Sequence, residues 1–190
     1  MPGPTSAERG QAVRRRLLDA AAELIPELGW SGVSTRVLAE RAAVTPGLVH
    51  YHFASLRQLL TEAVLRTARQ LLEQPLALLD QAPDAATGID RLFGVLDAYT
   101  GTDPTSLLLV EAYLAATRDA ALRTELATLI GEFRAELAGW LRARGQGASS
   151  EAIAVVLAAA IDGVMLHRGL DPAVELGPVA TVLQIGRAHV

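Results

Sequence analysis

The stretch from Ser34 to Arg57, STRVLAERAAVTPGLVHYHFASLR, decides the fold predicted for this chain. Ser34 and Thr45 are residue types that accept a hydrogen bond from the first amides of a helix, so each predicts a helix start. Pro46 follows Thr45 at the first helical position, where its missing N–H costs nothing. Because only residues 42–44 lie between the two predicted helices, we expect two short helices joined by a tight turn.

When two short helices cross steeply, the second can lie in the major groove of DNA while the first contacts the DNA backbone. Gly47 lowers the helix propensity by about 1 kcal/mol, which fits a helix start that must approach another surface closely. These features alone leave one alternative, an ordinary helical hairpin with an exposed second helix. An apolar seam at spacings of about one turn holds either arrangement together: Leu38, Ala42, Val44, Val49 and Phe53.

The composition favours a helical protein with a sizeable core. Hydrophobic residues make up 51% of the 190 residues, and aromatic residues only 4%. Pro26 should kink the first helix near Ala22, and Pro75 should bend or stop the long helix that Ser55 begins. A loop is expected over 82–88, and Asp171 with Pro172 predicts the start of the last helix. Outside the central pair and the helix after Ser55, helices are expected at about 8–28, 88–100, 104–117, 119–144, 149–169 and 172–186.

The net charge of −4 divides unevenly, with +2 over residues 1–60 and −6 over residues 61–190. This distribution suits a basic front part that binds DNA and an acidic body that does not. The run Arg14-Arg15-Arg16 either reaches phosphates or is a solvated helix end, and both readings stay open. The absence of cysteine, of a secretory segment and of any uncharged apolar run longer than 152–161 predicts a cytoplasmic protein without a membrane span.

The sequence offers no pattern for catalysis. His50 and His52 are two residues apart and point away from each other on a helix, so they do not form a helical metal pair. Glu132 and Glu136 are one turn apart, but Arg134 beside them indicates an exposed face. The chain lacks the zinc-protease, serine-hydrolase and phosphate-loop motifs and has no nucleophilic cysteine. We therefore expect no enzyme activity, no metal site and no cofactor.

Five elements of the sequence follow the pattern of one known family: LLDAAAELIPELGWSGVS (17–34), Thr35-Arg36, Leu38-Ala39, Ala42-Ala43-Val44-Thr45 and His50-Tyr51-His52-Phe53-Ala54-Ser55. Through them, residues 9 to 70 resemble the DNA-binding domain of the TetR family of bacterial transcriptional regulators. Three residues depart from the common family pattern: Ala43 replaces a turn glycine, His50 a phosphate-binding tyrosine, and Leu56 a lysine.

The resemblance implies an all-α fold with two domains. Residues 8–54 would form a three-helix DNA-binding domain with the helix-turn-helix, and residues 55–187 a larger helical domain for effector binding and dimerisation. It further implies a repressor that binds a palindromic double-stranded DNA operator as a dimer and is released by a small-molecule effector. We expect Thr45, Pro46, Gly47 and Leu48 to face base edges, and Arg36, His50, Tyr51, His52 and Arg57 to contact the DNA backbone. Thr35 and Ser55 complete the expected DNA-binding residues.

The resemblance also places the effector pocket and the dimer contact in the second domain. The last two helices, about 149–186, would pair with their copies in a homodimer; the alternative is that 149–169 is a helix buried within one chain. A rival function, kept open by Ala43, His50 and Leu56, is a helical ligand-binding or scaffold protein that has lost DNA binding. Candidate pocket residues, each of which can equally be core or solvated surface, are Tyr99, Leu108, Glu111, Tyr113, Phe133, Trp140, Asp162 and His167.

Overall fold

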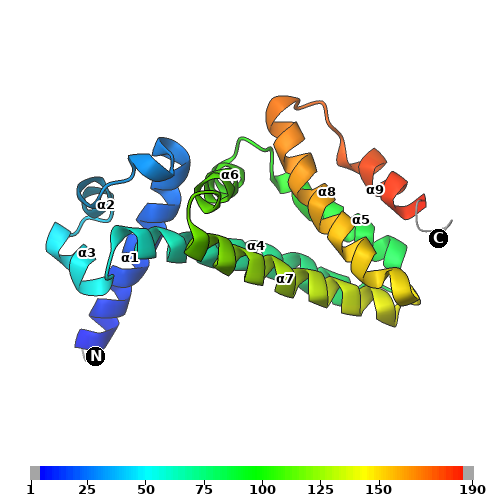
Figure 1. Ribbon diagram of the computed structural model, residues 1–190, viewed down its shortest axis with the longest axis horizontal. Helices are drawn as coiled ribbons and strands as arrows, with labels where there is room; N and C mark the ends of the chain where they lie inside the picture. The colour runs from blue at the N-terminus through cyan, green and yellow to red at the C-terminus, as the bar shows by residue number, and fades with distance from the viewer. Residues whose placement is uncertain (1–4, 186–190) are drawn as a thin grey trace. The chain divides into compact units, whose positions relative to one another are not determined.

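The computed structural model describes the backbone of residues 5–185 and the side chains of residues 5–182, and every regular element in that part of the chain is a helix (Figure 1). The predicted helical fold class is therefore confirmed. The predicted ends at 186 and 187 lie outside the described residues. The α-helices are α1 (Ser6–Leu28), α2 (Thr35–Arg41), α3 (Pro46–His52), α4 (Leu56–Asp80), α5 (Ala85–Val95), α6 (Pro104–Ala116), α7 (Ala120–Ala143), α8 (Ser150–Leu170) and α9 (Leu176–Ile185), with short 3-10 turns at Trp30–Gly32, Leu96–Ala98 and Gly147–Ser149.

The chain divides into two compact units. The described part of the first unit comprises residues 5–68 and 107–123, and that of the second comprises residues 69–106 and 124–185. The long helices α4 and α7 each begin in the first unit and end in the second. The predicted domain boundary between residues 54 and 55 stays a prediction.

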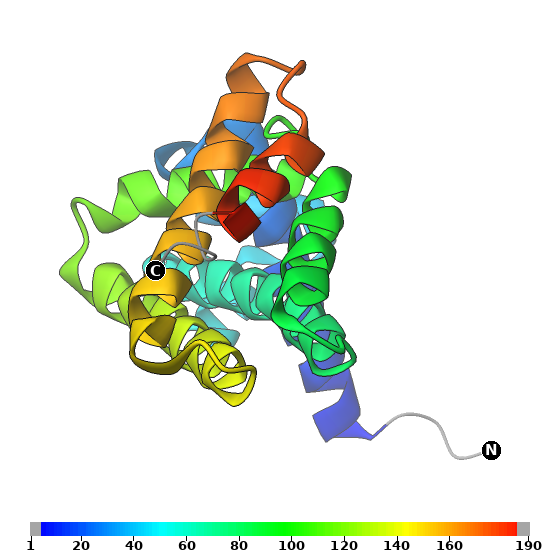
Figure 2. The same ribbon diagram turned by 90° about the vertical axis from the view of Figure 1, so that its right-hand side faces the viewer.

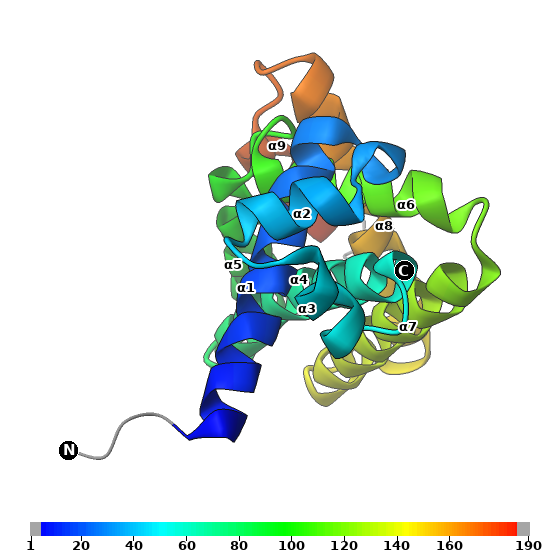
Figure 3. The ribbon, with the colours of Figure 1, turned by 90° about the vertical axis from the view of Figure 1, so that its left-hand side faces the viewer.

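The first unit is built around α1, whose buried side carries Leu17, Leu24 and Ile25. The helix starts two residues earlier than predicted because Thr5 and Glu8 form a reciprocal capping box, with the Thr5 amide 2.6 Å from Glu8 Oε2. The helices α2 and α3 lie against one another beside α1, as Figure 3 shows. The core is completed by Leu38 of α2 and by Leu59 of α4, which are both fully buried.

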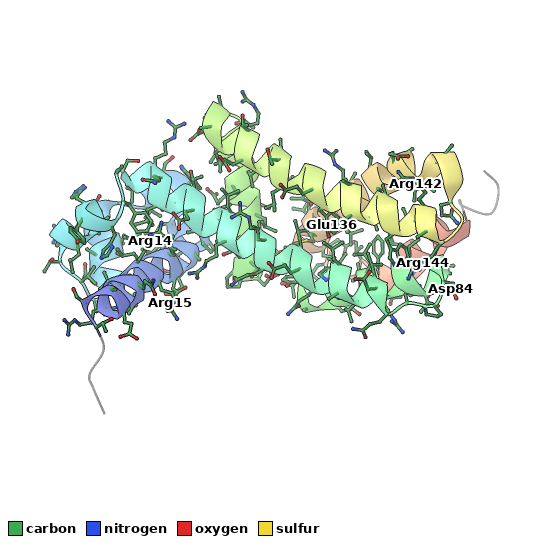
Figure 4. The ribbon with its side chains drawn as sticks, turned by 90° about the horizontal axis from the view of Figure 1, so that it is seen from below. Arg14, Arg15, Asp84, Glu136, Arg142 and Arg144 are labelled. Atoms are coloured by element: carbon green, nitrogen blue, oxygen red, sulfur yellow. The ribbon has the colours of Figure 1, made fainter. Side chains whose placement is uncertain are left out.

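In the second unit, α5 and α9 pack side by side (Figure 2). At the far end of α4, the Trp140 indole N–H donates a hydrogen bond of 2.7 Å to the Leu79 carbonyl. Gly88 makes this contact possible, since a Cβ there would lie 2.2 Å from Trp140 Cη2. Arg144, labelled in Figure 4, stacks 4.3 Å from the Trp140 ring and donates to the Ala82 carbonyl at 2.9 Å. These contacts join α4, α5 and α7 at one corner.

Several helix limits differ from the prediction. The predicted stop at Pro75 is wrong, because α4 continues past this residue to Asp80, with the Leu79 side chain buried; the alternative, a bend at Pro75, stays a prediction. The predicted loop over 82–88 is shorter, because the Asp84 carboxylate caps α5 through the Thr87 amide at 2.8 Å. The last helix begins at Leu176 rather than 172, because the Asp171 carboxylate instead closes a turn by accepting from the Ala173 amide at 3.0 Å.

Candidate nucleic-acid interface

The predicted helix-turn-helix is formed by α2 and α3, with residues 42–45 between them. Ser34 caps α2 as predicted, since its hydroxyl oxygen accepts from the Val37 amide at 3.3 Å. Ala43 has a φ of 51°, in the left-handed region that favours glycine. The Val44 amide then bonds to the Ala39 carbonyl at 2.9 Å and closes the turn. The alanine at position 43 therefore strains the turn without preventing it.

One side of α3 is held in the core and the other faces solvent. Val49 is 2% exposed and Phe53, directly after the helix, is 3% exposed. Tyr51, on the opposite side, is 81% exposed. Of the residues predicted to contact DNA from this region, Leu48 and His52 are half-buried. The others are exposed: Thr45, Pro46, Gly47, His50, Tyr51 and Ser55. The leading end of α3 is thus presented as an outward surface.

The predicted Thr45 cap of α3 is wrong. Thr45 occupies the N-cap position with φ −78° and ψ 147°, but its side chain makes no capping hydrogen bond. The Leu48 amide bonds instead to the Thr45 backbone carbonyl at 3.0 Å, so the first turn closes without the hydroxyl. The exposed Thr45 hydroxyl is therefore not used to begin the helix.

Several arginines of the first unit are already paired. The Arg14 guanidinium forms a double ion pair with Glu62 and lies 4.7 Å from the centre of the Phe53 ring. Figure 4 labels Arg14 and its neighbour Arg15 on α1. Arg41 bonds to Glu27 at 2.6 Å and to Glu23 at 3.2 Å. Arg14 thus joins α1 to α4 at a half-buried position, where the sequence had suggested a phosphate contact or a solvated helix end.

The exposed side chain of Arg36 and those of Arg15 and Arg16 make no ion pair within residues 5–182. Thr35, next to Arg36, is half-buried at the start of α2. These three arginines are therefore among the exposed cations of the first unit that phosphates can reach without displacing an acid.

The end of α3 is joined to α4 by a rigid turn. The Ser55 hydroxyl accepts from the Gln58 amide at 3.1 Å, and the Gln58 side-chain oxygen accepts from the Ala54 amide at 3.0 Å. Ser55 therefore caps α4, as predicted. Arg57, two residues later, pairs with Asp119 at the start of α7. Nothing in the sequence predicted this partner of Arg57.

Glu111 has a structural partner, the Trp30 amide, that the sequence did not indicate. Its carboxylate accepts from the Trp30 amide at 2.8 Å and lies 3.5 Å from the position that a Gly29 Cβ would take. The carboxylate therefore holds the 3-10 turn after α1 to α6 within the first unit. The sequence had suggested a pocket, core or surface position for Glu111, and its bond to a backbone amide 81 positions earlier was not among these expectations.

The predicted pocket residues are divided between the two units. Leu108, Glu111 and Tyr113 belong to the first, with Leu108 in its core and Tyr113 43% exposed. In the second, Trp140 is buried against the Leu79 carbonyl, and Asp162 and His167 are exposed on α8. Tyr99 is half-buried, and this burial raises the pKa of its phenol. The negative charge of the Asp103 carboxylate raises that pKa further.

A groove with a volume of about 190 Å³ lies between α4 and α7 in the second unit. Of the eight predicted pocket residues, it contains only Phe133, which is buried at its base. Its full lining is Arg69, Leu72, Glu73, Leu76, Leu129, Glu132, Phe133 and Glu136. The described residues hold no group of three histidine, aspartate or glutamate side chains placed to bind a metal ion.

One stretch of the described chain, Gly147–Leu170, has the length and mean hydropathy, 1.7, of a membrane-spanning helix. This stretch contains α8, which exposes Val155, Val156 and Leu166 at 48%, 54% and 53%. Length and composition alone are weak evidence for a membrane span, because the core helix of a soluble protein or a signal sequence passes the same test.

Comparison with known proteins identifies the family. The model described as "Bacterial regulatory proteins, tetR family" matches residues 17–63, and "Tetracyclin repressor-like, C-terminal domain" matches residues 83–186. The HTH-type transcriptional regulator BetI of Rhizobium meliloti (strain 1021) is 30% identical over 164 residues, covering 84% of this chain and 79% of that protein. An HTH-type transcriptional regulator of Mycobacterium tuberculosis (strain ATCC 25618 / H37Rv) is 27% identical and covers 90% of both chains.

Solved structures share the fold. The multidrug binding protein EbrR complexed with malachite green is 33% identical, with a TM-score of 0.68 over 90% of this chain and 95% of that one. A transcriptional regulator from Pseudomonas aeruginosa PAO1 is 24% identical, with a TM-score of 0.77 over 90% of this chain and 86% of that one, and shows likeness of fold alone. The chain therefore belongs to the TetR family of DNA-binding transcriptional regulators.

Proposed function

We propose that this regulator is a cytoplasmic repressor without catalytic activity, which binds a palindromic DNA operator as a homodimer and is released by a small-molecule effector. In this proposal the leading end of α3, residues 45–48, faces base edges in the major groove, while Arg36, His50 and Tyr51 contact phosphates. The observation that carries the proposal is that α3 has one buried and one exposed side, since Val49 is buried and Tyr51 is 81% exposed. A helix held in this way can enter the groove without unfolding its own domain.

The proposed dimer joins α8 and α9 to their copies in a second chain. Most of the apolar stretch 147–170 is not buried within one chain, and Val156 and Leu166 are more than half exposed. Val182 of α9 is 67% exposed. Apolar surface of this kind is stabilised by burial between subunits, and a symmetric pair of recognition helices requires a palindromic site.

The proposed effector site is the groove between α4 and α7. Phe133 and leucines form its apolar part, while three carboxylates and the single guanidinium of Arg69 surround it. This charge balance favours an organic cation. The relative EbrR was solved with malachite green, which supports the same class of ligand. Binding of the effector would lower the affinity for DNA by the factor by which DNA lowers the affinity for the effector.

DNA binding is tested by selecting sequences from a random duplex pool with the full chain and measuring affinity by fluorescence anisotropy. We expect a palindromic consensus and an affinity that falls steeply as salt rises, because phosphate contacts release counterions. The rival function, a ligand-binding or scaffold protein without DNA binding, predicts no enriched sequence and no binding even at low salt.

The effector site is tested with malachite green as the probe. We expect the dye to release the selected duplex and the variant Glu136→Gln to bind the dye about threefold more weakly, because one favourable charge is lost. Glu125→Gln removes an exposed carboxylate from the same helix outside the groove and should leave dye binding unchanged. Equal dye affinity for the chain and for Glu136→Gln would contradict this site.

A further inference from the structure

The Arg57–Asp119 ion pair is unusual among the pairs of the first unit because one partner is fixed and the other is open to solvent. The Asp119 side chain is only 11% exposed, whereas that of Arg57 is 60% exposed. Asp119 Oδ1 also accepts from the Leu122 amide at 3.0 Å and thereby caps α7. The Arg57 guanidinium and the Leu122 amide together hold the pKa of the Asp119 carboxyl below its ordinary value. Asp119 is therefore a charged, largely buried anchor held by two partners.

The ion pair uses one edge of the guanidinium and leaves another open. Asp119 accepts from Arg57 Nε and Nη2, which is the side-on arrangement. The Nη1 group and the second Nη2 hydrogen remain, and these form the planar fork that matches two oxygens of a phosphate. Because the side-on bond fixes the plane of the guanidinium, it also fixes the direction of the fork.

Arg57 lies close in the chain to the recognition helix. It follows Phe53, the residue directly after α3, by four positions, and hydrogen bonds among Ala54, Ser55 and Gln58 hold the intervening turn. A cation at this place is next to the surface that the proposed function assigns to the DNA backbone. Its anchor, Asp119, comes from the region that matches the C-terminal family model.

We propose that Asp119 is a positioning residue for DNA binding, which holds the Arg57 guanidinium so that its open edge receives a backbone phosphate. This inference rests on the proposed DNA-binding function. In this proposal the acidic residue Asp119 strengthens the binding of DNA, although DNA is itself negatively charged. Acting through its charge alone, Asp119 would repel phosphates, and its neutralisation would tighten binding.

The positioning role and a purely repulsive charge predict opposite changes in DNA affinity when Asp119 is neutralised, so one affinity measurement separates them. The duplex recovered by selection is bound to the full chain, to Asp119→Asn, to Arg57→Ala and to the double variant, each across a salt series. Asparagine keeps an oxygen that can cap α7, and melting curves check that each variant is folded. We expect Arg57→Ala to weaken binding about tenfold and Asp119→Asn about fivefold, and each to reduce the salt slope by about one phosphate contact.

In the Arg57→Ala background, Asp119→Asn should cause no further loss, since the residue that it positions is gone. Asp19→Asn is the matched control, because it also removes the acidic partner of an α4 arginine, Arg66, in the same unit. We expect it to change the affinity less than twofold.

Equal or tighter binding by Asp119→Asn would overturn the proposal, and so would a loss that persists in the Arg57→Ala background. If the unaltered chain binds the duplex but Arg57→Ala binds equally well, this inference fails while the proposed function stands. If the unaltered chain binds no selected duplex, both fail.

Discussion

Replacement of Val156 by aspartate should convert the dimer into a monomer. Val156 is 54% exposed on α8, so burial in the dimer would remove about half of its side chain from water, worth about 1 kcal/mol. A carboxylate at the same place adds a desolvation cost of at least a similar size. Because a two-fold interface contains the residue twice, we expect a loss of about 4 kcal/mol, or roughly a thousandfold in the dimer dissociation constant.

The assay is sedimentation equilibrium at micromolar concentration, with the duplex affinity measured in parallel. The unaltered chain should show twice the chain mass of 20.1 kDa, and Val156→Asp should show the single mass with much weaker DNA binding. Leu114→Asp is the matched control, because Leu114 is 52% exposed but lies on α6, outside the proposed interface. A mass of 20.1 kDa for the unaltered chain, or an intact dimer for Val156→Asp, would refute the reasoning.

Three further outcomes are expected. Arg36→Ala should weaken binding about tenfold on every DNA sequence in an anisotropy titration, because the contact is to phosphate; a loss confined to one sequence would contradict that role. Glu111→Ala should lower the free energy of unfolding by about 1–3 kcal/mol in a denaturant titration, because the Trp30 amide loses its acceptor, and Glu111→Gln, which keeps an oxygen, should lower it less; equal losses would contradict this account. Hydrogen bonds from Ser106 and Thr100 outweigh burial and lower the pKa of the Asp103 carboxyl, so the stabilisation by its charge is complete above its ordinary value of 3.8. That stabilisation should vanish as the pH falls through the lowered pKa of Asp103 in the folded chain. The difference in free energy of unfolding between the unaltered chain and Asp103→Asn should therefore shrink with acidification, and a difference that grows below pH 3.8 would contradict this prediction.

Local chemistry explains why much of the fold could be predicted. The Ser34 cap and the proline at position 46 mark helix starts that depend only on neighbouring residues, and both agree with the structure. The start of α9 could not be predicted in this way. Asp171 can cap a helix or close a turn with equal local chemistry, and here it closes a turn with Ala173.

The partners of charged residues could not be predicted, because they are set by packing between distant segments. Arg14 pairs with a glutamate 48 positions away, and Arg57 with an aspartate 62 positions away. Glu111 accepts from the Trp30 amide 81 positions earlier, a contact that its neighbours in the sequence do not indicate. The outward face of α3 was predictable, because the burial of Val49 and Phe53 follows from helical periodicity.

The placement of the leading end of α3 in a DNA groove can be measured directly, because the chain contains no cysteine. A single cysteine at Thr45, carrying a photocrosslinker, is bound to the selected duplex, and the modified bases are mapped. Our account predicts adducts at two symmetric positions, one in each half-site, whereas a cysteine at the exposed residue Glu125 should give none. Complex formation with no adduct from position 45, or with the adducts of the Glu125 control, would contradict the account.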